Sequence, residues 1–448
     1  MSCPTSPFGI DRQRLESLVS KALEEAADRG ADQAETGVSL GTGLSVMVRR
    51  GEVETLEHQR DRSFAVTVYF DRRKGYASTS DLSDQAIEDT VAKACTIAGY
   101  TARDEYAGLA DAELMATEIP DLSLDHPWAL TPEEAIDRAI ECERYGMQFD
   151  DRINNADGTS VHTGRALKMY GNSHGFRGGY ASTSHSLSCI LVAEDGDGME
   201  RDYWYTSSRD PEQLEDAESV GRRAAERTVR RLGARKRSTR TAPVLFPADQ
   251  ARGLLGHFVA AIRGTSQYRK ASFLLDAAGS SVFPDFLSMV ERPHIPGALG
   301  SAPFDNEGVA TRDRDLVRDG VLESYVLSSY SARRLGLQTT GNAGGLHNLV
   351  VSHGDATFDE LIREMGTGFV VNELMGQGVN GVTGDYSRGA SGFWVENGEI
   401  AYPVTELTIA GNLKKMYRDI VAIGKDVDDR GGIRTGSILV KQMTIAGD

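Results

Sequence analysis

Apolar residues recur at helical spacing along the first part of the chain. Residues 11–29 place them three or four positions apart, which predicts a helix with one buried face. The predicted buried residues are Leu15, Leu18, Val19, Ala22, Leu23 and Ala26. A second amphipathic helix is expected around residues 84–100. A third begins at Thr131, because Thr is a favoured N-cap and Pro132 fits the first helical position.

Alternation of apolar and polar residues indicates β-strands between these helices. Residues 44–50 and 63–70 alternate in this way and are joined through a polar stretch. The hexapeptide GYASTS occurs twice, at residues 75–80 and 179–184, each time beside strand-like sequence. A structural duplication and a chance similarity of two hairpins both remain open, since six residues are far shorter than a repeat unit.

The middle of the chain carries a predicted domain boundary. A long charged helix over residues 211–232 leads into the small, basic, Pro-ended stretch 233–243, which has the composition of a linker. Beyond it, short strand candidates alternate with glycine-rich turns. Three helices are expected there, near residues 248–262, 327–335 and 357–366. We therefore predict an α+β fold with two domains, 1–235 with helices and an antiparallel sheet, and 241–448 predominantly β with short helices.

The net charge of the chain limits the partners that it can bind. The net charge of -17 opposes binding to nucleic-acid phosphates, so no nucleic-acid partner is expected. One basic cluster is an exception, and a solvated helix face running into a linker is favoured for it over a polyanion site. It consists of Arg222, Arg223, Arg227, Arg230, Arg231, Arg235, Lys236, Arg237 and Arg240.

Cysteines and apolar runs bear on the compartment. No C-x-x-C pair occurs among Cys3, Cys95, Cys142 and Cys189, which favours reduced thiols over disulfides or a thiolate metal cluster. The N-terminus has no basic flank followed by an apolar stretch, and no apolar run is long enough to span a membrane. We expect a cytoplasmic protein without a membrane partner.

Three short motifs match known sites by letter but lack the required context. Residues 171–175 read G-x-S-x-G, yet strand-like sequence follows where a nucleophile elbow needs a helix. Residues 376–381 read G-x-G-x-x-G, again with no helix to receive a pyrophosphate. Residues 195–198 suggest a calcium loop, but Ala193 and Trp204 stand at ligand positions. Turns are predicted at the first and the third, and no dinucleotide site at the second.

The segment 251–276, ARGLLGHFVAAIRGTSQYRKASFLLD, resembles the zinc-protease helix of the TldD/PmbA family. Similar stretches extend the resemblance along most of the C-terminal half and into the N-terminal half. They are GYASTSD, GMERDYWY, GSAPFDNEGV, SYSARRLGL, GTGFVVNELMGQGVNGVTGDYSRGASGFWVENGEI and TIAGNLKKM. Matches of this length are far more specific than any of the three short motifs.

The resemblance also shows what this chain lacks. TldD-type members carry H-E-x-x-x-H on this helix and a cysteine near the C-terminus as the third zinc ligand. Here His257 is followed by Phe258, Ile262 occupies the second histidine position, and every cysteine lies in the first half. A catalytic zinc needs about three protein ligands. The chain therefore resembles the PmbA (TldE) branch, and we expect no metal or cofactor in it.

The resemblance implies a function as the non-catalytic, zinc-less subunit of a heteromeric metalloprotease that degrades or trims unfolded and leader peptides. Zinc is expected in a TldD-type partner. One alternative is an autonomous metallopeptidase whose metal would be held by His294, His347 or His353, although none of these lies at i, i+4 spacing from another histidine. Another is a regulatory protein-binding factor. A homodimer of the isolated chain is left open.

A glycine-rich segment near residue 385 is the second candidate site. Asp385, Tyr386 and Arg388 place charge and an aromatic ring among glycines that permit close backbone approach. They are predicted to line a peptide-binding cleft or a subunit contact. A structural turn held by an Asp–Arg pair is the alternative.

Overall fold

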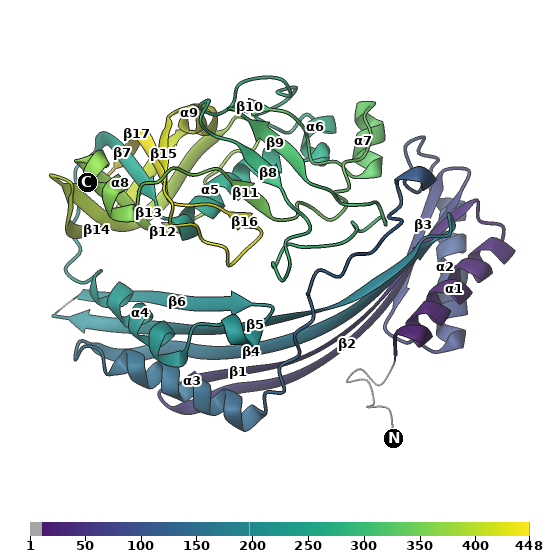
Figure 1. Cartoon of the computed structure of the whole chain (residues 1–448), viewed down its shortest axis with the longest axis horizontal. Coiled ribbons are helices and arrows are strands. Elements are labelled where there is room, and N and C mark those ends of the chain that lie inside the picture. The colour runs from purple at the N-terminus through teal and green to yellow at the C-terminus, as the bar shows by residue number, and fades with distance from the viewer. Residues whose placement is uncertain (1–10, 197, 448) are drawn as a thin grey trace.

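The structure is a computed structural model that describes residues 11–196 and 198–447 (Figure 1). Its first half contains, in order, α1 (Arg12–Asp28), β1 (Gln33–Arg49), β2 (Glu52–Phe70), β3 (Arg73–Thr79), α2 (Asp84–Tyr100), η1 (Ala112–Leu114), α3 (Pro132–Met147), β4 (Ile153–Asn172), β5 (Arg177–Asp195), β6 (Gly198–Ser208), η2 (Pro211–Gln213) and α4 (Ala217–Val229). These elements confirm the predicted helices over residues 11–29 and 84–100. They also confirm the helix that begins after Thr131.

The second half is richer in short strands. It contains β7 (Arg240–Phe246), α5 (Ala248–Ala261), α6 (Gly264–Tyr268), β8 (Met289–Glu291), β9 (Arg314–Arg318), β10 (Val321–Leu322), α7 (Ser329–Leu335), β11 (Leu349–Val351), α8 (Phe358–Met365), β12 (Gly368–Met375), β13 (Asp385–Glu396), β14 (Glu399–Asn412), α9 (Leu413–Arg418), β15 (Ile420–Ile423), β16 (Ile433–Arg434) and β17 (Ile438–Ala446). The α+β class is confirmed. The division at residues 235–241 stays a prediction.

The N-terminal sheet is built from two copies of one element order. A helix, three strands and a helix occur as α1-β1-β2-β3-α2 and again as α3-β4-β5-β6-α4. The sheet order β3-β2-β1-β4-β5-β6 reads outward from the antiparallel β1–β4 pair in both copies. The two GYASTS hexapeptides fall in β3 and β5, the third strand of one copy and the second of the other. They are not equivalent, so the duplication lies in the topology and the hexapeptide does not mark it.

Both helix pairs cover the same face of this sheet, one pair at each end (Figure 1). Val38 and Leu40 of β1 pack in a cluster with α1 and α2. Further along the same face, Leu44 and Val46 pack with α3 and α4. The side chains of β1 alternate with period two, which keeps all four residues on one face. The opposite face is left for the C-terminal half.

The polar stretch between the two predicted short strands is itself strand. Residues 52–63 of β2 pair with β1, whereas β3 pairs only with residues 64–70, so residues 52–63 form a sheet edge within the described chain. This segment is exposed and rich in charge, with Glu54 and Arg60 among its residues. Charged residues protect an edge strand from unwanted pairing. Sequence alternation missed it because neither of its faces is buried.

The predicted helix over residues 211–232 is wrong at its start. A short 3-10 turn, η2, comes first, and α4 begins only at Ala217. The backbone N–H of Ser219 donates to the Asp216 side chain at 2.7 Å. Asp216 is therefore an N-cap, and the chain before it is held in a different conformation.

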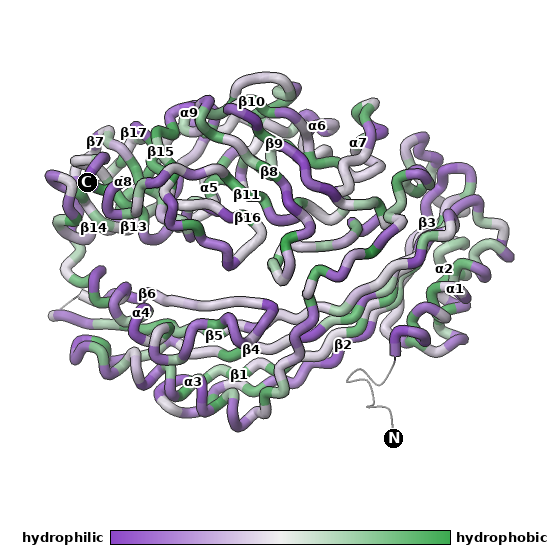
Figure 2. Tube along the Cα trace, in the orientation of Figure 1, coloured by the Kyte–Doolittle hydropathy of each residue, from purple (hydrophilic) through white to green (hydrophobic). Residues whose placement is uncertain are grey.

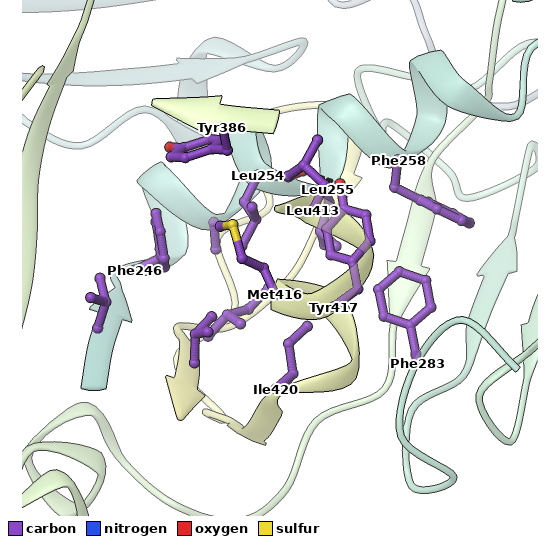
Figure 3. Close-up of a cluster of buried hydrophobic side chains, with 14 of the residues drawn as sticks. Phe246, Leu254, Leu255, Phe258, Phe283, Tyr386, Leu413, Met416, Tyr417 and Ile420 are labelled. Carbon is purple, nitrogen blue, oxygen red and sulfur yellow. Dashed lines mark hydrogen bonds between the residues drawn. The ribbon is translucent and has the colours of Figure 1, made fainter. Parts of the chain in front are cut away.

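The C-terminal half consists of two sheets around an apolar core. One has the order β14-β13-β12-β7-β17-β15 and the other β10-β9-β8-β11-β16. Helix α5 packs into the core between them, where Leu254, Leu255 and Phe258 are buried (Figure 3). Figure 2 shows hydrophobic stretches in this region, interleaved with hydrophilic ones. This core fixes the orientation of α5.

The basic cluster over residues 222–240 is only in part the solvated face that its composition suggested. Its exposed members are Arg222, Arg223, Arg230, Arg235 and Lys236, whereas others contact the C-terminal half. Arg231 lies 3.0 Å from Glu200 of β6 and 2.9 Å from Glu373 of β12. Arg237 stacks over the ring of Trp394, with 4.6 Å from its guanidinium carbon to the ring centroid. Arg231 therefore joins the first half of the chain to the second, and Arg237 holds the segment before β7 against β13.

The described residues of the three short motifs lie in or beside turns and loops, which confirms the turn predicted at residues 171–175. Residues 173–175 join β4 to β5, and the glycine-rich residues 376–381 follow β12 without a helix after them. The DGDG motif joins β5 to β6, with residue 197 outside the described residues. Among the residues described, no helix is both long and apolar enough to cross a membrane.

Candidate functional site

Helix α5 presents two faces with different surroundings. Phe258 and Ile262 are fully buried, and the ring of Phe258 meets Phe283 edge-on at a centroid distance of 5.0 Å (Figure 3). His257 lies on another face of the helix, together with Ala260 and Ala261. The structure therefore separates the predicted site residues: only His257 reaches a cavity, and Phe258 and Ile262 belong to the core.

A cavity of about 260 Å³ lies between α5 and the glycine-rich loop before β13. Its lining residues are His257, Ala260, Ala261, Ser266, Ala271, Phe273, Gly376, Gln377, Val379, Gly381 and Arg388. The walls come from segments more than 100 residues apart in the sequence, brought together by the sheet that contains β12 and β13.

The loop that forms one wall is held against β13 by its backbone. The N–H of Ser387 donates to the carbonyl of Gly378 at 2.7 Å. A Cβ atom at Gly378 would lie 1.8 Å from the carbonyl oxygen of Ser387, so this approach requires glycine. Gly378 of the G-x-G-x-x-G motif is therefore needed for a close backbone contact that shapes the cavity.

Arg388 supplies the charge of this cavity. Its Nη2 donates to the carbonyl of Leu374 at 3.2 Å, whereas its Nε is buried without a partner. Burial, followed by the positive charge of Arg388, lowers the pKa of His257 below its ordinary value. His257 is therefore a neutral imidazole at pH 7, beside a guanidinium cation.

Tyr386 lies behind His257. Their rings meet edge-on with 6.0 Å between centroids, and burial raises the pKa of Tyr386 to about 12. Its hydroxyl is buried and has no hydrogen-bond partner among the described residues. Asp385 is exposed and bonds instead to Thr383 at 2.6 Å and to Asn412 at 3.1 Å. The Asp–Arg pair considered from the sequence is not formed, and of the three predicted residues only Arg388 lines the cavity.

The three histidines of the alternative metal site each have a local partner. His294 bonds to Thr311 at 2.9 Å, and His347 to the buried Glu291 at 3.1 Å. His353 bonds to the carbonyl of Gly354 at 2.9 Å. Within residues 11–196 and 198–447, no group of three or more His, Cys, Asp or Glu residues is arranged to hold a metal ion.

A second, larger opening was missed by sequence reasoning. A cleft of about 930 Å³ lies where β6 and α4 face the C-terminal half. In it Arg430 lies over the rings of Trp204 and Tyr205, at 4.1 and 4.5 Å from their centroids. Nothing in the sequence could link residues 204 and 430, because their contact exists only in the folded chain.

Family comparisons place the chain among the metallopeptidases. Three models match: PmbA/TldA metallopeptidase domain 1 over residues 34–98, the central domain over 125–232 and the C-terminal domain over 239–447. The chain belongs to the PmbA/TldA metallopeptidase family, and the resemblance seen in its sequence is confirmed.

Whole-length relatives agree with this assignment. The chain is 52% identical over 442 residues to Metalloprotease PmbA of Escherichia coli O157:H7, covering 99% of this chain and 98% of that protein. It is 48% identical over 445 residues to a Metalloprotease PmbA homolog of Haemophilus influenzae, covering 99% of this chain and 98% of the homolog.

Solved structures show the same fold. A proposed modulator of DNA gyrase from Bacteroides thetaiotaomicron has a TM-score of 0.92 at 29% identity, covering 97% of this chain and 99% of that one. TldE from Thermococcus kodakarensis has a TM-score of 0.83 at 19% identity, covering 97% of this chain and all of that one. The second similarity concerns the fold alone.

The zinc that the family name implies does not fit the residues of α5. Phe258 and Ile262 offer only carbon atoms and are buried in the core. His257 remains as one donor, and Arg388 places a positive charge on the same cavity. A dication needs about three ligands and disfavours a cation nearby, so this cavity is not suited to a catalytic zinc.

Proposed function

We propose that this chain is the non-catalytic subunit of a heteromeric metalloprotease that degrades or trims unfolded and leader peptides. The observation that carries the proposal is the pairing of His257 with Arg388 on one cavity. A guanidinium stands there, and the positions beside His257 that would supply a general base and a second ligand hold Phe258 and Ile262. The zinc would then belong to a TldD-type partner.

The core supports this assignment by a second physical argument. Phe258 packs against Phe283 and Tyr417, at centroid distances of 5.0 and 6.2 Å. A glutamate at this place would be buried without a partner, which is costly. Helix α5 is therefore adapted to apolar packing on the face where catalysis would need polar groups.

Two alternatives are less favoured. An autonomous metallopeptidase would need His294, His347 or His353 to abandon its partner and converge on one metal. A regulatory factor that acts through a protein partner is compatible with the fold, but the net charge of -17 opposes direct contact with DNA. We propose the cytoplasm as the compartment.

Isolation of the tagged chain from native cells tests the proposal. We expect a TldD-type chain to co-purify, with hydrolysis of an unstructured peptide by the pair and by neither this chain alone nor a zinc-stripped pair. A tagged, unrelated acidic protein from the same cells serves as the control for adventitious capture. Peptide hydrolysis by this chain alone, at the rate of the pair, would contradict the proposal.

A further inference from the structure

Arg388 has unused hydrogen-bonding capacity in a half-buried place. A guanidinium carries five N–H donors, and Arg388 uses one of them, to Leu374. Its Nε is buried without a partner among the described residues. By contrast, the half-buried Arg209 donates to the carbonyls of Thr183, Ala298 and Leu299. A guanidinium left this incomplete fits a site whose missing partner is a ligand.

The charged and polar groups that line the cavity favour an anionic ligand. No Asp or Glu side chain lines it, while His257 and Gln377 add polar groups without a hydrogen-bond partner among the described residues. A carboxylate is the natural complement of a guanidinium, because the two can form a pair of parallel hydrogen bonds. The neutral imidazole of His257 can donate one further hydrogen bond to it.

The size and the lining of the cavity further restrict the class of ligand that fits. Its volume of about 260 Å³ lies below the range of drug-sized pockets, ~300–1,000 Å³, and leaves room for about one residue. Most of the remaining lining side chains are apolar, and the hydroxyl of Ser266 is already used, since it donates to the carbonyl of Ala260 at 2.8 Å. The apolar side chains are those of Ala260, Ala261, Ala271, Phe273 and Val379. A carboxylate attached to a small apolar group matches both features.

We infer that the cavity between α5 and β13 binds a carboxylate of a peptide, with Arg388 as the recognising group. The cavity lies against the face of α5 that carries His257, the one residue here that matches the H-E-x-x-x-H pattern of TldD-type chains. The peptide nature of the ligand rests on the proposed function. Carboxylate recognition itself rests only on the cavity and Arg388.

The test measures, by calorimetry, how tightly peptides bind to the isolated full chain. Three probes separate the sources of the carboxylate: N-acetyl-tetra-alanine as the free acid, the same peptide as its C-terminal amide, and an amidated analogue that carries one internal glutamate. We expect at least one acid probe to bind clearly tighter than the amide. If the free acid binds, the C-terminus is the recognised group, and if the glutamate analogue binds, an acidic side chain is recognised.

Substitutions in and outside the cavity test whether the probe binds there. Arg388→Gln should weaken binding of the acid probe about tenfold or more, the loss typical when a charged hydrogen-bond donor is removed. Ala260→Leu should weaken it without touching Arg388, by filling the cavity. Arg363→Gln, an exposed arginine on α8, is the matched control and should bind as the parent does. Thermal melting checks that each variant is folded.

Equal binding of the acids and the amide by the parent chain would overturn the inference. So would acid binding that survives both Arg388→Gln and Ala260→Leu. Neither result depends on hydrolysis or on a second subunit. A failure here is therefore distinguishable from a failure of the proposed pairing with a TldD-type chain.

Discussion

Nη1 of Arg231 lies 2.9 Å from Oε2 of Glu373, and this ion pair joins the chain just after α4, in the N-terminal half, to β12 of the C-terminal half. The Arg231 side chain is only 11% exposed, whereas that of Glu373 is 39% exposed, so the arginine end of this pair is the one shielded from solvent. The same guanidinium also faces the buried Asp202 at 3.8 Å. One cation thus neutralises acidic groups from both halves.

Replacing Arg231 with alanine should lower the free energy of unfolding by about 3 kcal/mol, since the buried carboxylate of Asp202 and the largely buried one of Glu200 both lose this cation. Chemical denaturation of the full chain measures the loss. Arg222→Ala is the matched control, because Arg222 forms an exposed pair with Glu218 on the same helix. That variant should change stability by about 0.5 kcal/mol or less. Equal effects of the two changes would contradict the account of the basic cluster.

Gly75 should not tolerate a methyl group. A Cβ at this position would lie 1.9 Å from the carbonyl of Ala94, where β3 packs on α2. We expect Gly75→Ala to cost about 1–3 kcal/mol through overpacking. Gly99→Ala, in α2 with nothing within 4 Å of the added Cβ, should instead be neutral or stabilising by up to about 1 kcal/mol. Thermal melting compares the stability of both variants with that of the parent chain. A Gly75→Ala protein as stable as the parent would show that β3 and α2 are packed less closely than described here.

Asp305 should make the chain less stable as pH rises from acid to neutral. Burial, followed by the negative charge of Glu307, raises the pKa of Asp305 to about 7. In the unfolded chain this carboxyl ionises near pH 4. Between about pH 4 and 7 the folded state therefore holds a proton that the unfolded state has lost, and stability falls with rising pH.

The variant Asp305→Asn should show a shallower fall over that window, because its side chain does not titrate. Urea denaturation at a series of pH values measures the slope, which for one group is at most about 1.4 kcal/mol per pH unit. Asp315→Asn, at a more exposed site, is the control. Parallel pH profiles for the parent and Asp305→Asn would rule out this source of pH dependence.

Restoring the spelling H-E-x-x-x-H should damage the protein without creating an enzyme. The double change Phe258→Glu and Ile262→His places two polar groups where both side chains are fully buried. We expect a loss of about 3–5 kcal/mol and no zinc-dependent hydrolysis of an unstructured peptide. Ala260→His, at an exposed position on the same helix, should remain as stable as the parent. Zinc-dependent turnover by the double variant would reveal a latent site and favour the autonomous-peptidase hypothesis.

Local signals in the sequence predicted the helices well. The third helix begins as expected because Thr131 and Glu134 form a reciprocal capping box, with hydrogen bonds of 2.9 and 3.2 Å. Strand lengths were harder to predict. Residues 52–63 lack any apolar alternation, and their place in β2 follows from pairing with β1, a contact that no local pattern encodes.

The candidate site could be predicted only in part. His257 was found through the resemblance of its helix, and Arg388 through the charge among glycines. Their meeting on one cavity depends on sheet pairing between distant segments, which sequence spacing does not reveal. Asp385 does not line this cavity for a local reason: its carboxylate bonds to Thr383 and Asn412 and not to Arg388. A place for Asp385 at a subunit contact stays a prediction.

The zinc content of the purified, isolated chain tests the central claim most directly. After mild chelation and dialysis, elemental analysis should find far less than one zinc per chain, because a single histidine beside an arginine cannot replace a full ligand set. The TldD-type partner, treated in the same way and then reloaded, should retain about one zinc per chain, the usual stoichiometry of a catalytic site. About one tightly held zinc per chain in the isolated protein described here would contradict the account.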